Sequence, residues 1–417
     1  MNHYPFPKSR ITGPLIGGAL LLLLLVTRDS MYSMMVWDFY TCQFLSLGIM
    51  GLLGLSFAAV NRKQLLPIVR DPRMVLIIIA VAAAAIPMAV KADWQLMYFS
   101  IIIGLVFAVF LSYFRTLDQT ARWYVITMCV LGLWSILTAY LLRIPVDRGL
   151  VAMTPVTNNN GVEFFNFVFS IVPDTYVNTR NFGIFREPGV YQFFLIIALY
   201  LNNDILCWDR EWKLWAVNGI LALTLLTTFA TGGMIEMCLL FAVLFFEKKW
   251  YRSKWILAGL GVLCVLGAAG VFYLVTAKNE LYYTFLDMVA KFTRNPESVG
   301  SRLGSITMGI QIFLRSPLFG EPVTTVLHSM VDYSASTLIL YNIFGILGGS
   351  LNAAGWFALV WKKERNVLVN LALLLVLFMA FNTQNLTWNL FFWLFPGMAL
   401  AERGIPSARK LLSHKKA

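Results

Sequence analysis

The chain has 417 residues, of which 59% are hydrophobic and only 13% are charged. A soluble protein of this length carries roughly 25% charged residues, so this composition indicates that lipid surrounds most of the chain. The net charge of +12 does not indicate a nucleic-acid partner, because the basic residues lie in short clusters between apolar runs and form no basic face.

Twelve apolar runs are long enough for membrane helices, each of which needs about 20 residues to cross the hydrocarbon layer. Backbone groups in lipid must be paired within each segment, so the predicted fold class is an all-α polytopic membrane helix bundle of about 12 transmembrane helices. The runs are 11–27, 37–60, 74–92, 96–114, 123–142, 188–203, 214–230, 233–247, 255–276, 337–360, 367–382 and 384–400. The first run lacks a cleavage site and is expected to stay as a signal anchor.

The distribution of lysine and arginine predicts the orientation of these spans. With the N-terminus inside, 22 of the 33 basic residues fall in short cytoplasmic segments, as the positive-inside rule requires. Nine of the remaining 11 lie in two long segments, which are largely exempt from that rule. We therefore expect a multi-pass protein of the bacterial cytoplasmic (inner) membrane with both termini in the cytoplasm.

The two long segments are predicted to be outer-face loops that bear short helices. Long loops on a rigid bundle commonly carry function, and each contains an apolar stretch, Phe164–Val172 or Leu281–Phe292, that we expect at the membrane surface. The chain then divides into five parts. These are a five-span bundle (1–142), a first long outer loop (143–187), a four-span segment (188–276), a second long outer loop (277–336), and a three-span segment with a basic tail (337–417).

The first loop ends in two arginines, Arg180 and Arg186, followed by Glu187 and Pro188 at the start of the next span. A guanidinium group suits phosphate oxygens and keeps its charge, and a helix N-terminus adds unpaired N–H groups. These arginines are therefore candidate phosphate ligands. The alternative is that they extend toward lipid headgroups without binding a substrate.

The second loop contains Arg302 before a stretch of helical spacing (303–313), then Arg315, and later His328. Imidazole can act as a base near neutral pH, and Asp332, four residues on, lies on the same face of a helix and can orient it. Tyr333 is a candidate for stacking on a sugar ring. The alternatives are a structural role for His328 and a membrane-belt role for the tyrosine.

These motifs, in this order, resemble the O-antigen ligase/polymerase superfamily over roughly residues 175–350. The resemblance rests on R-x-x-G-x-F-x-x-P (Arg180 to Pro188), an arginine after a Ser/Gly stretch (Arg302), P-L-F-G (Pro317–Gly320), His328-Ser329, and a Gly-Ile-Leu-Gly turn. Ser329 stands where many members have Asn, and Glu187-Pro188-Gly189 replaces the commoner x-Pro-Asn. The Glu-Pro pair is more similar to capsular and exopolysaccharide polymerases than to ligases.

The resemblance implies a glycosyltransferase that uses an undecaprenyl-pyrophosphate-linked glycan as both donor and acceptor, without a metal or another cofactor. It implies that Arg180 and Arg302 hold the pyrophosphate and that His328 activates the acceptor hydroxyl. Arg186 is a further candidate ligand, because without Mg²⁺ two or three arginines must meet the charge of the leaving group. Glu187 is the second candidate base, and Asp332, Tyr333 and Arg315 are supporting residues. The implied partners are membrane lipid and a chain-length regulator protein.

Two other functions remain open from the sequence. A ligase would move the same lipid-linked glycan to a lipid A core or to protein, and no residue decides between the two acceptors. A transporter or flippase of lipid-linked sugars also fits twelve spans, but transporters usually place ionisable residues inside spans and use discontinuous helices. The predicted spans here are nearly free of charge, and the arginines concentrate in the loops.

Overall fold

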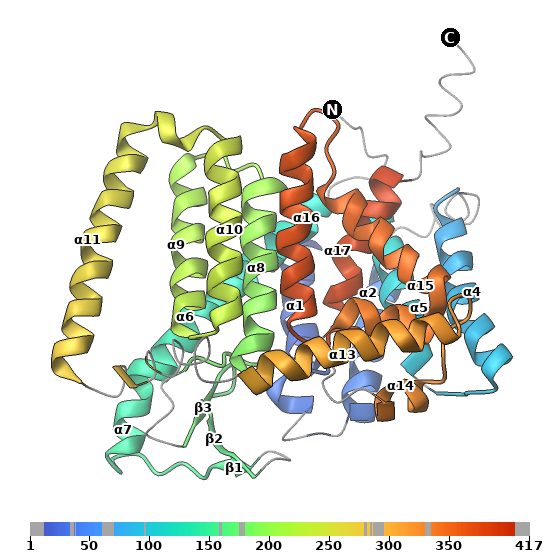
Figure 1. The fold of residues 1–417 in the computed structure, drawn as a ribbon, viewed down its shortest axis with the longest axis horizontal. Helices are drawn as coiled ribbons and strands as arrows, with labels where there is room; N and C mark the ends of the chain where they lie inside the picture. The colour runs from blue at the N-terminus through green and yellow to red at the C-terminus, as the bar shows by residue number, and fades with distance from the viewer. Residues whose placement is uncertain are drawn as a thin grey trace.

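The computed structural model describes residues 12–33, 37, 39–60, 71–95, 97–157, 161–174, 180–278, 282–283, 286, 296–329 and 335–404. Nearly all of the described secondary structure is helical, and long helices stand side by side with a small sheet at one end of the bundle (Figure 1). We call this end, which carries the three strands, the sheet end. Four described helical stretches are long and apolar enough to cross a membrane: Tyr40–Ala59, Met74–Lys91, Leu117–Asp147 and Ser336–Val360. These helices indicate a membrane protein.

Eleven of the predicted spans coincide with helices. They are α1 (Thr12–Val26), α2 (Phe39–Val60), α4 (Met74–Lys91), α5 (Met97–Phe114), α6 (Leu117–Leu137), α8 (Pro188–Asp204), α9 (Glu211–Thr227), α10 (Thr231–Glu247), α11 (Lys254–Ala277), α15 (Ser336–Val360) and α16 (Val367–Asn382). The α6 helix starts before its predicted span because Thr116 caps it by accepting a hydrogen bond from the Gln119 amide. It continues through a π-helical turn, η3 (Thr138–Leu142), into α7 (Arg143–Asp147).

The predicted span over 384–400 is helical only in its second half. The helix α17 covers Phe391–Ala399 and is followed by the π-helical turn η5 (Leu400–Gly404), whereas residues 383–390 form turns. The polar side chains of this stretch bind backbone groups and so compete with a helix. Asn389, for example, accepts the amide of Phe391, and the Thr387 hydroxyl donates to the Ser336 carbonyl.

The first long loop contains an antiparallel sheet that the all-α prediction did not include. Its strands are β1 (Val156–Thr157), β2 (Glu163–Asn166) and β3 (Ile171–Pro173), paired in that order. Phe164 and Ile171 are buried against Met31 and Phe182. Much of the apolar surface of Phe164–Val172 is thus used for packing within the protein, whereas Val168 is exposed.

The second long loop contains α13 (Pro296–Arg315) and α14 (Val323–Ser329). The predicted helix over 303–313 is confirmed as part of α13, which crosses the long helices at a steep angle at the sheet end (Figure 1). Ser305 and Ile312 are buried, whereas Ile306 and Ile310 are exposed. The helix thus presents small and apolar groups to the bundle and leaves a second apolar row uncovered. The stretch Leu281–Phe292 lies largely outside the described residues.

The α15 helix is interrupted at Gly345, whose φ is +61° and ψ is −164°. The turn 317–320 fits against this break. The amide of Ile346 donates to the Pro317 carbonyl (2.8 Å), and the amide of Glu321 donates to the Asn342 carbonyl (2.6 Å). The P-L-F-G and Gly-Ile-Leu-Gly motifs therefore pack against each other. Backbone groups that an unbroken α15 would pair within the helix are instead paired with the backbone of the turn and of Glu321.

The α8 helix occupies the centre of the bundle. Every side chain from Val190 to Asn203 is buried, and α8 packs against α6, α9, α10 and α16. Such a helix has no lipid-facing side, so the position of its first residue is fixed by packing on all sides. The Arg186-Glu187 pair directly precedes this helix.

An ion network joins three loops at the end opposite the sheet. Arg365 pairs with Asp204 and with Glu247, the latter at 2.7 Å, and Lys362 pairs with Asp204 at 3.0 Å. The side chains of Asp204 and Arg365 are 1% and 5% exposed. The network links the ends of α8 and α10 to the turn between α15 and α16.

Candidate functional site

The segment 180–187 is held in place by hydrogen bonds from Asn181. This residue is 1% exposed, and its side-chain amide donates to the hydroxyls of Ser135 (2.9 Å) and Thr227 (3.0 Å). Its backbone amide donates to the Thr227 carbonyl, and its side-chain oxygen accepts the amide of Gly183. The segment is thereby tied to α6 and to the turn between α9 and α10.

Two apolar contacts complete the anchoring. Phe185 is fully buried and stacks on Phe194, with ring centroids 4.2 Å apart. Gly183 has a φ of +56°, and a Cβ there would lie 2.5 Å from a ring carbon of Tyr191. The Gly and Phe of the R-x-x-G-x-F-x-x-P motif therefore hold the segment on α8, and its arginines project from a fixed backbone.

Arg180 lies beside the turn between α9 and α10. Its Nε donates to the Thr228 carbonyl at 3.1 Å. Burial lowers the pKa of its guanidinium, while the nearby Glu187 carboxylate opposes that shift. Arginine keeps its proton under ordinary conditions, so the lowered pKa expresses the cost of holding a cation away from water. An anion placed beside Arg180 would relieve that cost.

Arg186 is paired with carboxylates from two segments. Its Nε lies 3.3 Å from Asp29 in the loop after α1, and its Nη2 lies 3.3 Å from Glu187. Asp29 is also held by the side-chain amide of Asn389, at 3.1 Å. Backbone hydrogen bonds also join the two segments. The Arg186 amide donates to the Asp29 carbonyl, and the Met31 amide donates to the Ile184 carbonyl.

Arg28 belongs to the same charged group, although the sequence analysis did not select it. Burial lowers the pKa of its guanidinium to about 10, Asp29 opposes this shift, and Arg186 adds to it. Its Nη1 is out of contact with solvent, and its guanidinium lies 5.7 Å from the ring centroid of Trp388. We define the arginine cluster as Arg28, Asp29, Arg180, Arg186 and Glu187. Its three cations and two carboxylates leave one net positive charge.

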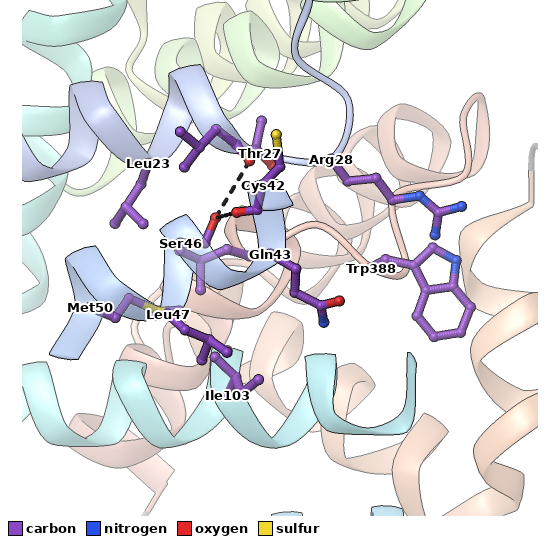
Figure 2. Close-up of a pocket in the computed structure, with 13 residues that line it drawn as sticks. Leu23, Thr27, Arg28, Cys42, Gln43, Ser46, Leu47, Met50, Ile103 and Trp388 are labelled. Atoms are coloured by element: carbon purple, nitrogen blue, oxygen red, sulfur yellow. Dashed lines mark hydrogen bonds between the residues drawn. The ribbon is translucent and has the colours of Figure 1, made fainter. Parts of the chain in front are cut away.

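A cavity lies next to the arginine cluster, between α1, α2, α5 and the turn before α17 (Figure 2). Its volume is about 50 Å³, and it opens to the surroundings. Arg28 and Trp388 lie at one side of it, and apolar side chains such as Leu23 and Met50 lie at the other (Figure 2). The charged group thus borders an apolar space.

His328 lies on α14, away from the hydrogen bonds that build the arginine cluster. It is exposed, and its Nδ1 is 2.6 Å from the Thr324 carbonyl of its own helix. The start of α14 is tied to the turn after α4, where Asp93 accepts the amide of Val323 at 2.7 Å and Lys91 pairs with Glu321 at 3.6 Å. In the described part of the chain, neither a hydrogen bond nor an ion pair joins His328 to the arginine cluster.

The other residues predicted from the second loop are placed only in part. Arg302 lies in the first half of α13, and its side chain is outside the described part. Arg315 ends α13 and is exposed. Asp332 and Tyr333 lie outside the described residues. The described site therefore consists of the first-loop residues, with Asp29 and Arg28 added from the loop after α1.

The described site can bind an anion, because its formal charge is positive and two of its guanidinium groups are costly to leave without a counter-charge. The N-terminus of α8 lies directly beside it and adds a favourable dipole. Among the described residues, no group of three or more His, Cys, Asp or Glu side chains could hold a metal ion. Comparison with protein-family models, curated proteins and solved structures finds no match to this chain.

Proposed function

We propose that the protein is a glycosyltransferase that polymerises undecaprenyl-pyrophosphate-linked oligosaccharide repeat units at the outer face of the bacterial cytoplasmic membrane. The observation that carries this proposal is the arginine cluster, a net positive group at the end of an apolar helix bundle and beside an apolar cavity. A diphosphate attached to a lipid chain matches this environment, because the diphosphate suits the positive cluster and the lipid chain suits the apolar surroundings. The motif order in the sequence adds the glycan to this chemistry.

The proposed reaction transfers a glycan chain from one lipid pyrophosphate to another lipid-linked repeat unit. A sugar hydroxyl of the acceptor forms a bond to the anomeric carbon of the donor while the bond from that carbon to the pyrophosphate oxygen breaks. The hydroxyl proton passes to a base, and undecaprenyl pyrophosphate leaves with the bonding electron pair. The lengthened glycan stays on the acceptor lipid.

The arginines act on the leaving group. Negative charge grows on the pyrophosphate as the bond breaks, and fixed cations lower the barrier by meeting that charge in the transition state. Arg28 and Arg180 fit this role because the bundle partly buries them, and electrostatic attraction is stronger there than in bulk water. Arg186 is partly neutralised by Asp29 and Glu187, so we assign it chiefly to positioning. Arg302 is proposed as a further ligand.

Two residues are proposed as the base that accepts the hydroxyl proton. Glu187 adjoins the arginine cluster, and His328 lies on the separately anchored α14. A positioned base typically contributes about 10²–10⁴-fold in rate. Glu187→Gln and His328→Gln variants separate the two, since only loss of the base removes the corresponding ionisation from the pH profile of the turnover rate.

The proposed topology has twelve spans with both termini in the cytoplasm, and α17 together with the turn before it provides the last span. The sheet end then faces outward, together with the arginine cluster. The ion network around Asp204 faces the cytoplasm. Membrane lipid and a chain-length regulator are the proposed partners.

The decisive experiment supplies the purified protein, in lipid vesicles, with only a lipid-linked repeat unit. A polymerase should build a ladder of products on a gel, whereas a ligase should leave the unit unchanged. Arg180→Ala should slow the ladder by about 100-fold or more, since loss of one transition-state donor has effects of this size. Arg148→Ala is the matched control, because Arg148 is an exposed arginine of the same loop outside the cluster.

One structural observation favours transport, namely the interruption of α15 at Gly345, since transporters use discontinuous helices. The backbone of the turn 317–320 meets this break, which leaves less backbone available for a transported ion. Translocation of a fluorescent lipid-linked sugar provides the test. If Arg180→Ala left polymer formation intact and stopped translocation, the protein would be a transporter.

A further inference from the structure

Glu236 is an acidic residue in the interior of the helix bundle. It lies in the second turn of α10, which stands beside α8 and α9 (Figure 1), and it is 0% exposed. Both carboxyl oxygens are out of contact with solvent, and within the described part of the chain neither has a hydrogen-bond partner. An unpaired carboxylate in such surroundings is costly, so this position requires a proton or another cation.

The ionisable groups around α10 do not compensate this acid. In the described part of the chain, α10 packs against α8, α9, α16 and η4 (Trp250–Arg252), and α16 contains no ionisable residue. The ionisable residues of α8, α9, η4 and the end of α10 are Tyr191, Tyr200, Asp204, Glu211, Lys213, Tyr251, Arg252 and Glu247. The Tyr191 hydroxyl lies 3.3 Å from that of Ser135, and Tyr200 donates to Asp204. The others belong to the end of the bundle opposite the sheet (Figure 1).

A polar side chain of α8 lies on the same face of α10 as Glu236, one turn nearer to the sheet end. The side-chain oxygen of Gln192 accepts the Gly233 amide at 2.6 Å, and its nitrogen donates to the Thr383 hydroxyl at 3.0 Å. A Cβ at Gly232 or Gly233 would lie 3.3 Å or less from Gln192. Glu236 follows these glycines at spacings of four and three, and helical side chains lean toward the N-terminus of their helix. Its carboxyl group therefore leans toward Gln192.

The opposite direction along α10 is apolar. The buried residues that follow Glu236 on this helix are Met237, Leu240 and Leu244. The part of α8 that follows Gln192, residues 193–199, is buried and carries only hydrocarbon side chains. On the side of the sheet end, by contrast, the hydroxyl of Thr231 is buried at the first residue of α10, and Gln192 adds its amide. Polar groups that can pass a proton thus lie between Glu236 and the sheet end.

We propose that Glu236 is a proton-binding site inside the helix bundle, and that its proton exchanges with the sheet end past Gln192. A metal ion such as Ca²⁺ or Mg²⁺ takes several oxygen ligands, whereas the side-chain oxygen of Gln192 is already used by the Gly233 amide. A proton needs only one carboxyl oxygen. The neutral acid then lets α10 pack against α8 and α16 without a bare charge between them. The site does not depend on the proposed reaction, since a polymerase, a ligase and a transporter could each contain it.

Infrared spectroscopy of the purified protein in micelles observes the bound proton directly. A protonated carboxyl has a C=O stretching band that is separate from the amide and carboxylate bands. The difference between the parent and Glu236→Gln spectra at neutral pH should contain this band, and the band should shift in D₂O. Glu211→Gln is the matched control, because Glu211 is exposed at the start of α9, and its difference spectrum should lack the band. Absence of the band for Glu236→Gln, or a band that never shifts in D₂O, would overturn the proposal.

The exchange route is tested by Gln192→Leu. This variant should keep the carboxyl band and should slow its shift in D₂O by about tenfold, because one hydrogen-bonding group is lost from the route. A band that shifts as fast as in the parent would refute the route past Gln192.

A chemical test needs no variant. Dicyclohexylcarbodiimide dissolves in apolar surroundings and reacts with carboxylic acids: the acid proton passes to a carbodiimide nitrogen, the carboxyl oxygen bonds to the central carbon, and the adduct rearranges to a stable N-acylurea. Mass spectrometry of the unaltered protein should find this adduct on Glu236, and labelling should fall as the pH is raised, because the carboxylate does not react. Labelling confined to other carboxyls would contradict the proposal. Protection of Glu236 by sodium chloride, but not by choline chloride, at a fixed pH would assign the site to a metal ion instead.

Discussion

At the scale of single residues, Gly183 holds the segment 180–187 in place. Its φ of +56° is in the left-handed region, and a Cβ would meet Tyr191 in the core. Gly183→Ala should therefore destabilise the protein by about 1–3 kcal/mol, the usual cost of a left-handed non-glycine residue with a clash added. It should also slow polymer formation, because Arg180 and Arg186 would shift with the backbone. Thermal unfolding in detergent micelles measures the first effect.

The matched control for this substitution is Gly48→Ala. Gly48 lies in the middle of α2, and a Cβ there would meet nothing within 4 Å. Alanine is favoured over glycine in a helix by roughly 1 kcal/mol, so this variant should be as stable as the parent or more so. Equal loss of stability in the two variants would show that the strain at Gly183 does not matter.

Single residues also show where sequence reasoning stops. Arg180, Arg186 and Glu187 were selected because they are adjacent in the chain and lie at the start of a predicted span. Arg28 and Asp29 belong to the same cluster, but they lie about 150 positions before its other members in the sequence. Hydropathy does not reveal such a tertiary contact. Arg28 did leave one signal. It is an arginine in a short loop predicted to face outward, against the positive-inside rule.

At the scale of elements, the break in α15 depends on Gly345. A Cβ at this position would collide with the Leu318 carbonyl. Gly345→Ala should therefore expel the turn 317–320 and lower the free energy of unfolding by about 3 kcal/mol or more. Limited proteolysis should then cut near Leu318. Gly219→Ala in α9, where a Cβ meets nothing within 4 Å, should leave the proteolysis pattern unchanged.

A second contact between elements predicts a pH dependence. Glu402 in η5 lies beyond the last predicted span, and it accepts the Leu117 amide at the start of α6 at 2.7 Å. Burial raises the pKa of its carboxyl from 4.5 to about 7. The folded state then holds the proton more tightly than the unfolded state. The resulting stability is present below pH 4.5 and is lost as pH rises through 7.

Glu402→Gln should remove this loss, because the amide oxygen can still accept the Leu117 hydrogen bond and carries no charge. We expect the variant to be more stable than the parent by on the order of 1–3 kcal/mol at pH 8 and equally stable at pH 4. Unfolding in micelles at the two pH values measures the difference. A difference of the same size at both values would contradict the assignment.

Element prediction worked where the hydrophobic run was long and unbroken. Eleven predicted spans coincide with helices, because a run of apolar residues offers few side-chain groups that compete with the helix for backbone hydrogen bonds. The failures lie where side chains compete with the helix or find partners in other loops. The run of Asn and Thr between Thr383 and Asn389 forms turns, and Phe164 with Ile171 packs a β-hairpin onto Met31. Neither the turns over 383–389 nor the β-hairpin produces a hydrophobic periodicity that can be recognised in a single sequence.

At the scale of the whole molecule, the ion network around Asp204 joins helices that are distant in the sequence. Arg365→Met should leave the buried Asp204 carboxylate with Lys362 and the Tyr200 hydroxyl as partners. Loss of one member of a buried ion pair typically costs about 3–5 kcal/mol. The double variant Asp204→Asn with Arg365→Met should recover part of that loss. Lys213→Met removes an exposed ion pair with Asp209 at the same end and should not change the midpoint of thermal unfolding. Micelle unfolding compares all three.

The proposed orientation makes a whole-molecule prediction. In a cysteine-free background, Val168→Cys at the exposed tip of the sheet should react with a membrane-impermeant maleimide on intact cells. Lys363→Cys, which is exposed in the turn between α15 and α16, should react only after the membrane is opened. The reverse pattern would place the arginine cluster in the cytoplasm, and the proposed outer-face reaction would then be excluded.

The hydrogen bond between Asp29 and Asn389 spans 360 positions of the chain. It joins the loop after the first helix to the turn before the last one described, and the Gln192 to Thr383 bond spans another 191. During synthesis, the early helices must therefore wait in the membrane until almost all of the polypeptide has left the ribosome. A stalled or prematurely terminated product would carry every first-loop arginine and still lack Asn389, which holds the Asp29 carboxylate beside Arg186. An unfinished chain therefore cannot form the complete arginine cluster with its Asn389 contact.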